Sequence, residues 1–179
     1  MIIVLFEGQT NAKEREIVES SAEFASRKLF PRHRIYVVFK IIKNLLKNED
    51  VEGDIDYAEY EDDEIRPRNF MIRMQKGMEE EDLRTLVFHE LVHVKQIIKK
   101  ELTYKFDTKN WCYKTYFKGK NVTNVPYFDQ PHEKEAYQLQ EELLQEFKSN
   151  IIEIVVSMEG YYSWQLNKDL NMKKIQLAF

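Results

Sequence analysis

The clearest chemical signal in the sequence lies in residues 86–96, which read LVFHELVHVKQ. His89 and His93 are four positions apart, so on an α-helix their imidazoles share one face and can reach a single point. Glu90 is rotated by about 100° from His89 and therefore lies beside that face. Imidazole nitrogens are typical Zn²⁺ ligands, and a neighbouring carboxylate can take a proton from water at the ion. We predict that His89 and His93 bind zinc and that Glu90 is the general base.

The residues around this motif are mostly apolar, whereas a chance HExxH on a helix surface predicts polar neighbours and no metal. Burying two imidazoles and a carboxylate among leucines and valines is costly unless each polar group finds a partner. Helical spacing also divides the segment into faces. One stripe is predicted to pack into the core: Leu83, Val87, Leu91, Val94 and Ile98. Another side is predicted to face solvent: Arg84, Lys95 and Lys99.

The segment LVFHELVHV resembles the active-site helix of the zincin superfamily of zinc metallopeptidases. The resemblance covers only this short segment, and Lys95 departs from it because many members have an apolar residue there. It implies a zincin-like fold, zinc as the cofactor, and a peptide or protein as the substrate. The implied reaction is hydrolysis of a peptide bond.

A catalytic zinc site usually has three protein ligands and keeps a fourth position open. The next candidates lie in residues 127–142, YFDQPHEKEAYQLQEE. On the residues alone, His132, Glu133 and Glu135 are alternatives for the third ligand. The same stretch is also typical of an ordinary helix start, with Pro131 at the first helical position and a glutamate completing the cap.

Resemblance to the gluzincin branch of the zincins distinguishes among these candidates. In that branch the third ligand is a glutamate on a second helix, often followed three residues later by alanine. Glu133 and Ala136 fit this spacing, so the resemblance implies Glu133 as the ligand and close approach of the two helices at Ala136. Tyr137 stands where members often have an acid or an amide that contacts a ligand histidine.

Two further sets of residues could assist such a site. Gln96 lies three residues after His93 on the same side of the helix and could support that histidine. Phenol groups could donate a hydrogen bond to a developing oxyanion. The candidates are Tyr113, Tyr116, Tyr127, Tyr137, Tyr161 and Tyr162.

The elements expected to position these residues follow from hydrophobic periodicity. Strands are predicted at 2–6, 33–42, 51–60 and 69–74, helices at 11–29, 79–100 and 131–156, and short strands or extended loops at 102–106 and 113–118. The strands are not regularly interleaved with helices, which predicts an α+β fold: a small mixed or antiparallel sheet followed by two long helices that hold the metal site. By resemblance to zincins, the strand at 69–74 corresponds to the edge strand that holds an extended peptide.

Composition sets the remaining expectations. The 179 residues contain no linker or repeat, so we predict one domain over residues 1–179. The net charge of −4 gives no reason to expect nucleic acid or a membrane as a partner. Cys112 is the only cysteine, which excludes an internal disulfide and multi-cysteine zinc sites. No signal peptide or membrane-spanning run is evident, so a cytoplasmic location is expected. The sequence does not predict the oligomeric state.

The leading hypothesis is therefore a small zinc-dependent metallopeptidase with His89, His93 and Glu133 as ligands and Glu90 as general base. An alternative is a metal-binding regulatory or partner-binding module on a zincin scaffold that does not cleave peptides. At this length the chain offers no obvious second lobe for a deep substrate cleft, which favours the alternative.

Overall fold

The computed structural model describes residues 1–57 and 67–152. Its internal contacts divide the chain into two units, Met1–Leu144 and Gln145–Phe179. The fold and the site below lie in the first unit, and residues 145–152 of the second are helical. The predicted helix end near 156 and the strand end at 58–60 lie outside the described residues, and the single domain stays a prediction.

The main sheet has four strands in the order β1 (Ile2–Glu7), β2 (Ile35–Ile42), β4 (Asn69–Gln75) and β3 (Gly53–Tyr57). The first three are parallel to one another and β3 is antiparallel to β4. Period-two alternation explains β2, because every second side chain points into the core. The inward residues are Ile35, Val37, Phe39 and Ile41. This mixed sheet with long helices confirms the predicted α+β class.

The edge-strand prediction was wrong in its choice of strand. The strand predicted at 69–74 is β4, which lies between β2 and β3 inside the sheet. Within residues 1–57 and 67–152 the edge strand on this side is β3, so no described strand pairs with its outer N–H and C=O groups. Strand order depends on how the chain crosses the sheet, and hydrophobic periodicity does not report it.

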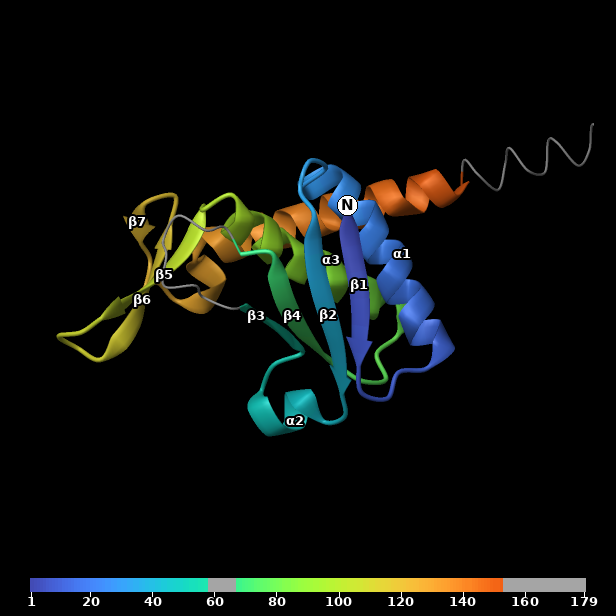
Figure 1. Cartoon of the computed structure of the whole chain (residues 1–179), viewed down its shortest axis with the longest axis horizontal. Coiled ribbons are helices and arrows are strands. Elements are labelled where there is room, and N and C mark those ends of the chain that lie inside the picture. The colour runs from blue at the N-terminus through green and yellow to red at the C-terminus, as the bar shows by residue number, and fades with distance from the viewer. Residues whose placement is uncertain (58–66, 153–179) are drawn as a thin grey trace, which may run out of the picture. The chain divides into compact units, whose positions relative to one another are not determined.

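Two helices cover one face of the sheet, α1 (Ala12–Leu29) and α3 (Glu80–Ile98), and they pack against each other (Figure 1). Helix α1 begins with a capping box, in which Asn11 accepts a hydrogen bond from the Glu14 backbone and the Glu14 carboxylate accepts one from the Asn11 backbone. Acidic residues fill the first turn of α3, at the positive end of its dipole. The predicted apolar stripe of α3 is buried.

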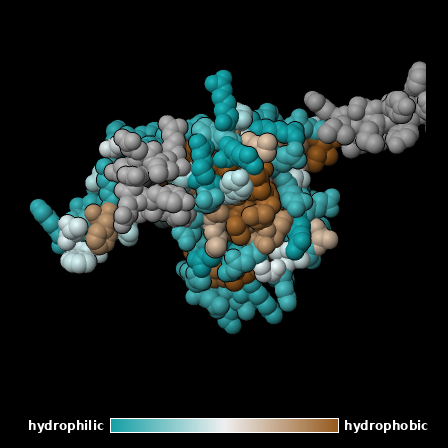
Figure 2. All heavy atoms as spheres, viewed as in Figure 1, coloured by the Kyte–Doolittle hydropathy of each residue, from teal (hydrophilic) through white to brown (hydrophobic). Residues whose placement is uncertain are grey.

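The opposite face of the sheet is open at β1 and β2, where apolar side chains gather (Figure 2). Leu5 of β1 and its register partner Val38 of β2 belong to this face. Among residues 1–57 and 67–152, no helix combines the length and apolar character needed to cross a bilayer.

The other elements of the first unit include a second sheet, a short turn and a short helix, and β5 of the second sheet contacts α3. A second sheet contains β5 (Leu102–Asp107), β6 (Cys112–Phe117) and β7 (Lys120–Asn121), all antiparallel. The short turn η1 (Tyr127–Asp129) precedes a helix that starts at 131. Helix α2 (Leu45–Glu49) was not predicted, because five residues are too few to show a helical period.

Candidate metal centre

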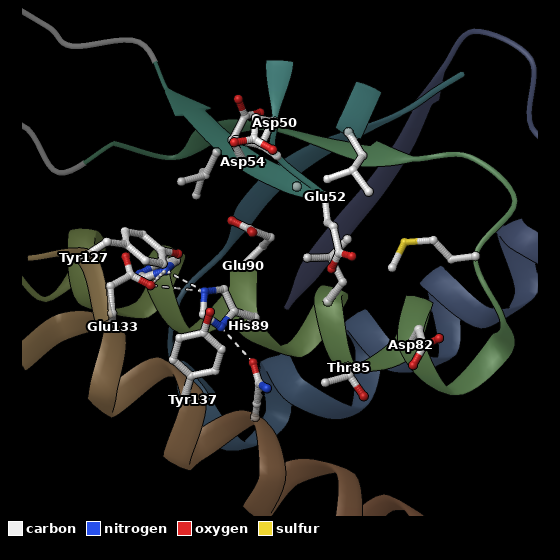
Figure 3. A pocket seen from close by; sticks show the side chains of 18 of the residues that line it. Asp50, Glu52, Asp54, Asp82, Thr85, His89, Glu90, Tyr127, Glu133 and Tyr137 are labelled. Carbon is white, nitrogen blue, oxygen red and sulfur yellow. Dashed lines mark hydrogen bonds and ion pairs between the residues drawn. The ribbon is translucent and has the colours of Figure 1, made fainter. Parts of the chain in front are cut away.

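Three buried side chains converge beside α3: His89, His93 and Glu133. Figure 3 shows His89 and Glu133 turned toward each other. The two Nε2 atoms are 3.1 Å apart, and Glu133 Oε2 lies 3.4 Å from Nε2 of His89 and 3.5 Å from Nε2 of His93. Around a tetrahedral ion with bonds of about 2.0–2.1 Å, neighbouring ligand atoms lie roughly 3.3–3.4 Å apart. The observed spacing is therefore that of a shared coordination sphere.

The carboxylate of Glu133 supports the same interpretation. Its Oε2 atom is buried and accepts no hydrogen bond from the described residues. An unsatisfied buried carboxylate oxygen is costly, and a cation between it and the two imidazoles would satisfy it. Burial by itself raises the pKa of Glu133, but the two facing imidazoles outweigh burial and hold the pKa below its usual range. Glu133 is thus ready to bind a metal ion as a carboxylate.

A glutamine amide orients His93. Gln96 Nε2 donates to the backbone oxygen of His132 at 3.0 Å and to Glu135 Oε2 at 2.9 Å. Its Oε1 therefore faces His93 Nδ1, at 2.9 Å, and must accept a hydrogen bond from it. The proton of His93 is then on Nδ1, which leaves the Nε2 lone pair directed at the triad. The predicted support by Gln96 is present.

A second glutamine does the same for His89, and the sequence analysis missed it. His89 Nδ1 lies 2.7 Å from Gln140 Oε1. At the position predicted from the resemblance, Tyr137 instead packs its ring against the imidazole of His89, with centroids 4.8 Å apart. Gln140 is three residues after Tyr137 on the same helix face, and that spacing was the only signal that could have found it.

The other two candidates for the third ligand lie outside the triad. Glu135 accepts from Gln96 and pairs with Lys118 at 3.1 Å. His132 is buried with its ring 5.8 Å from that of Phe117 and 6.1 Å from that of His93. Of the three alternatives, only Glu133 joins the two histidines.

Part of the predicted solvent-facing side of α3 was wrong. Lys99 is exposed, but Arg84 and Lys95 are buried. Arg84 donates to the hydroxyls of Ser20 and Ser21 on α1, and Lys95 pairs with Glu101 at 2.6 Å. Helical spacing places charged residues together but does not show that polar partners from other segments cover them.

Glu90 lies on the cleft side of α3, close to the edge strand β3. A Cβ atom on Gly53 would lie 3.2 Å from Glu90 Oε1 and 2.9 Å from Leu86 Cδ1, so only glycine leaves this space free. Burial raises the pKa of Glu90, although the nearby imidazoles oppose that rise. A buried carboxylate with a raised pKa is suited to accept a proton.

The triad and Glu90 open into a cleft of about 920 Å³. In Figure 3, Tyr127 and Glu133 lie on one side of Glu90, and Glu52, Thr85 and Asp82 lie on the other. Tyr127 lies beside Glu133 (Figure 3), and burial together with the negative charge of that carboxylate raises the pKa of Tyr127.

Of the predicted phenols, Tyr127 and Tyr137 line the cleft. Tyr113 and Tyr116 are in β6 away from its lining, and Tyr161 and Tyr162 lie outside the described residues. Cys112 is exposed and is not among the cleft residues.

No protein-family model, curated protein or solved structure matches this chain. What this chain can do chemically is therefore inferred from the motif and from the geometry of the site. That geometry brings together a buried His-His-Glu group that could hold a metal ion.

Proposed function

We propose that this protein is a zinc-dependent metallopeptidase of the gluzincin type. The observation that supports it most is the convergence of His89, His93 and the unsatisfied Glu133 Oε2, with Glu90 beside them at the wall of an open cleft. Two imidazoles and one carboxylate suit zinc, and leave a fourth position for water or substrate. When bound there, zinc would supply Lewis acidity to a substrate carbonyl and lower the pKa of water in the site.

The remaining steps belong to the protein's own groups. Glu90 takes a proton from the attacking water and then passes it to the leaving amine. The hydroxyls of Tyr127 and Tyr137, both at the cleft, are the candidates to donate a hydrogen bond to the oxygen that gains negative charge. The extended substrate pairs with the outer edge of β3, the last described strand of the sheet, whose Gly53 brings that edge close to Glu90.

Metal content tests the ligand assignment. The wild-type chain is expected to bind one zinc ion, and His93→Ala and Glu133→Gln are each expected to lose it, because a missing ligand weakens the site and leaves the others unsatisfied. His33→Ala is the matched control, since His33 is absent from the triad. Elemental analysis of dialysed protein gives the stoichiometry, and equal zinc in wild type and His93→Ala would contradict the proposal.

Glu90→Gln separates catalysis from metal binding. This variant is expected to keep its zinc, because Glu90 is not a ligand, and to lose hydrolysis of peptides by a factor of about 10² or more, because an amide cannot accept the proton. Peptide cleavage is followed by mass spectrometry on a mixed peptide library. Zinc binding without any cleavage by the wild type would favour the regulatory or partner-binding alternative.

A further inference from the structure

The β5–β6 hairpin carries a continuous aromatic face. In its register Leu102 pairs with Phe117, Tyr104 with Thr115, and Phe106 with Tyr113. Alternate residues of a strand point to the same side, so these three rows share one face of the hairpin. The tip adds Trp111, whose ring lies 6.1 Å from that of Phe106, and the Tyr113 ring lies 5.2 Å from Phe106.

Exposure rises steadily along this face, away from the core. Leu102 and Phe117 are buried, at 2% and 6% exposed, and Tyr104 in the next row lines the cleft. Beyond it, Phe106 is 47% exposed and Trp111 81%. We call Tyr104, Phe106, Trp111 and Tyr113 the hairpin aromatic face. It leads from the metal site's cleft out to solvent, and Figure 1 shows the hairpin extending away from the four-stranded sheet.

The charge of this segment is opposite to that of the rest of the chain. Residues 99–120 contain seven lysines and two acids, a net charge of +5, although the whole chain is −4 and the remainder is therefore −9. Lys109 belongs to the turn of the hairpin, whereas Lys105 and Lys114 form the row between the aromatic rows and point to its other face, where Lys114 pairs with Asp107 at 2.6 Å. The positive charge therefore belongs to the segment as a whole and to the hairpin turn, which also holds Trp111, and an exposed aromatic surface next to it favours a partner with apolar side chains and negative charge.

We propose that the hairpin aromatic face is an outer part of the substrate-binding cleft. It binds the part of an extended polypeptide substrate that lies beyond the scissile bond, an acidic segment whose apolar side chains contact Phe106 and Trp111. The proposal rests on the proposed peptidase function. Because Tyr104 belongs both to the cleft and to this face, a chain bound at Glu90 can continue along the hairpin without leaving the protein surface.

The length of the hairpin determines how long a substrate must be to contact the hairpin aromatic face. Successive rows on one strand face are about 7 Å apart, so a substrate must extend roughly four residues past the cleft to reach Phe106 and Trp111. Short peptides that fill only the cleft would not contact this face. A protein or long peptide substrate would gain affinity from it, while the chemical step would not change.

Binding is measured on the full chain with Glu90→Gln, so that peptide is not consumed. Two synthetic 16-residue peptides serve as probes, with the same uncharged half for the cleft, which is lined by acidic side chains, and with either glutamate or lysine at the charged positions of the half that extends along the hairpin. Peptide anisotropy gives the dissociation constant. In a Trp164→Phe background, Trp111 is the only tryptophan and its emission reports contact at the hairpin.

The glutamate peptide is expected to bind more tightly than the lysine peptide and to shift Trp111 emission to shorter wavelength. The double change Phe106→Ala and Trp111→Ala is expected to raise its dissociation constant about tenfold, as is usual when exposed aromatic anchors are removed. Tyr36→Ala removes an exposed aromatic from β2, away from the cleft, and is the matched control that should bind like the parent.

Unchanged affinity in the double variant, or tighter binding of the lysine peptide, would overturn the proposal. So would a shift of Trp111 emission with anionic phosphatidylserine vesicles or with RNA but not with the peptides. Peptidase activity is measured separately with a four-residue peptide. If the wild type lacks zinc-dependent cleavage but the hairpin still binds the acidic peptide, the peptidase proposal fails and polypeptide binding by this face stands.

Discussion

At the scale of single residues, two glutamines decide how the histidines present their nitrogens. Gln96 and Gln140 each place a carbonyl oxygen against an Nδ1 atom, which fixes the proton there and leaves both Nε2 atoms for the ion. The orientation of the Gln96 amide is better fixed than that of Gln140, because the NH₂ group of Gln96 donates hydrogen bonds to two acceptors. The two histidines are therefore oriented before any metal arrives.

Removing either amide should weaken metal binding without removing a ligand. Gln96→Leu and Gln140→Leu are each expected to raise the zinc dissociation constant by about 10- to 100-fold, the usual effect of losing a group that orients a metal-bound histidine. Competition with a chromophoric chelator measures the affinity. Gln138→Leu is the control, since Gln138 is exposed and bonds to Glu142 on the same helix. Equal affinity in all three variants would contradict the orienting role.

At the scale of elements, helix α3 is fixed on sides that its sequence does not mark as buried. Arg84 joins α3 to α1 through the hydroxyls of Ser20 and Ser21 and also bonds to Glu80 one turn earlier. Gln96 and Lys95 join the other end of α3 to the segments that contain His132, Glu135 and Glu101. Polar contacts thus hold helix α3 in place at both ends, and His89 and His93 lie between these contacts.

The buried hydrogen bonds of Arg84 are expected to stabilise the folded state. Arg84→Met keeps the apolar stem but leaves the two serine hydroxyls without this donor, so the free energy of unfolding should fall by about 1–3 kcal/mol. Lys99→Met, at the exposed end of the same helix, should change it by less than about 0.5 kcal/mol. Urea unfolding followed by circular dichroism compares them. Similar losses in both variants would show that the buried contact is not responsible.

The close packing of β3 against α3 at Gly53 is expected to affect kcat. Gly53→Ala places a methyl group where Leu86 Cδ1 and Glu90 Oε1 are only 2.9 and 3.2 Å away, so either side chain must move. We expect kcat to fall about tenfold with zinc content unchanged, because small displacements of a catalytic group are costly. Adding Leu86→Ala makes room and should restore part of kcat. A double variant no faster than Gly53→Ala would exclude crowding as the cause.

At the scale of the whole molecule, a metal ion would connect two separate parts of the chain. His89 and His93 belong to α3, whereas Glu133 belongs to the helix that begins at 131, after the second sheet. Binding that requires all three ligands occurs only in the folded state. Ligand binding of this kind stabilises the native state in proportion to the logarithm of ligand concentration over Kd.

Removal of metal should therefore lower the melting temperature. With zinc at a thousand times its Kd, the bound protein is expected to be more stable than the chelated protein by about 4 kcal/mol. Differential scanning calorimetry with and without EDTA measures the shift, and added zinc should reverse it. Glu133→Gln should show little difference between the two conditions. A wild-type melting temperature that does not change when EDTA is added would contradict a shared metal site.

Hydrophobic periodicity in the sequence predicted some elements of the fold correctly and others not. Periodicity located α1, β2, β4 and α3 closely, because each has a long, regular apolar pattern. It missed α2, which is too short, and it could not order the strands, so β4 was mistaken for the edge. The exposure of Arg84 and Lys95 was wrong because their partners come from distant parts of the chain.

The sequence by itself determined the pair of histidines and the carboxylate between them, because a four-residue helical spacing fixes their relative positions locally. Only the tertiary structure decided which of His132, Glu133 and Glu135 meets that pair, and that Gln140 orients His89. It also decided that β3 and Tyr104 of β5 border the cleft. These choices depend on contacts between residues far apart in the chain, which the packing of the fold creates and no local pattern encodes.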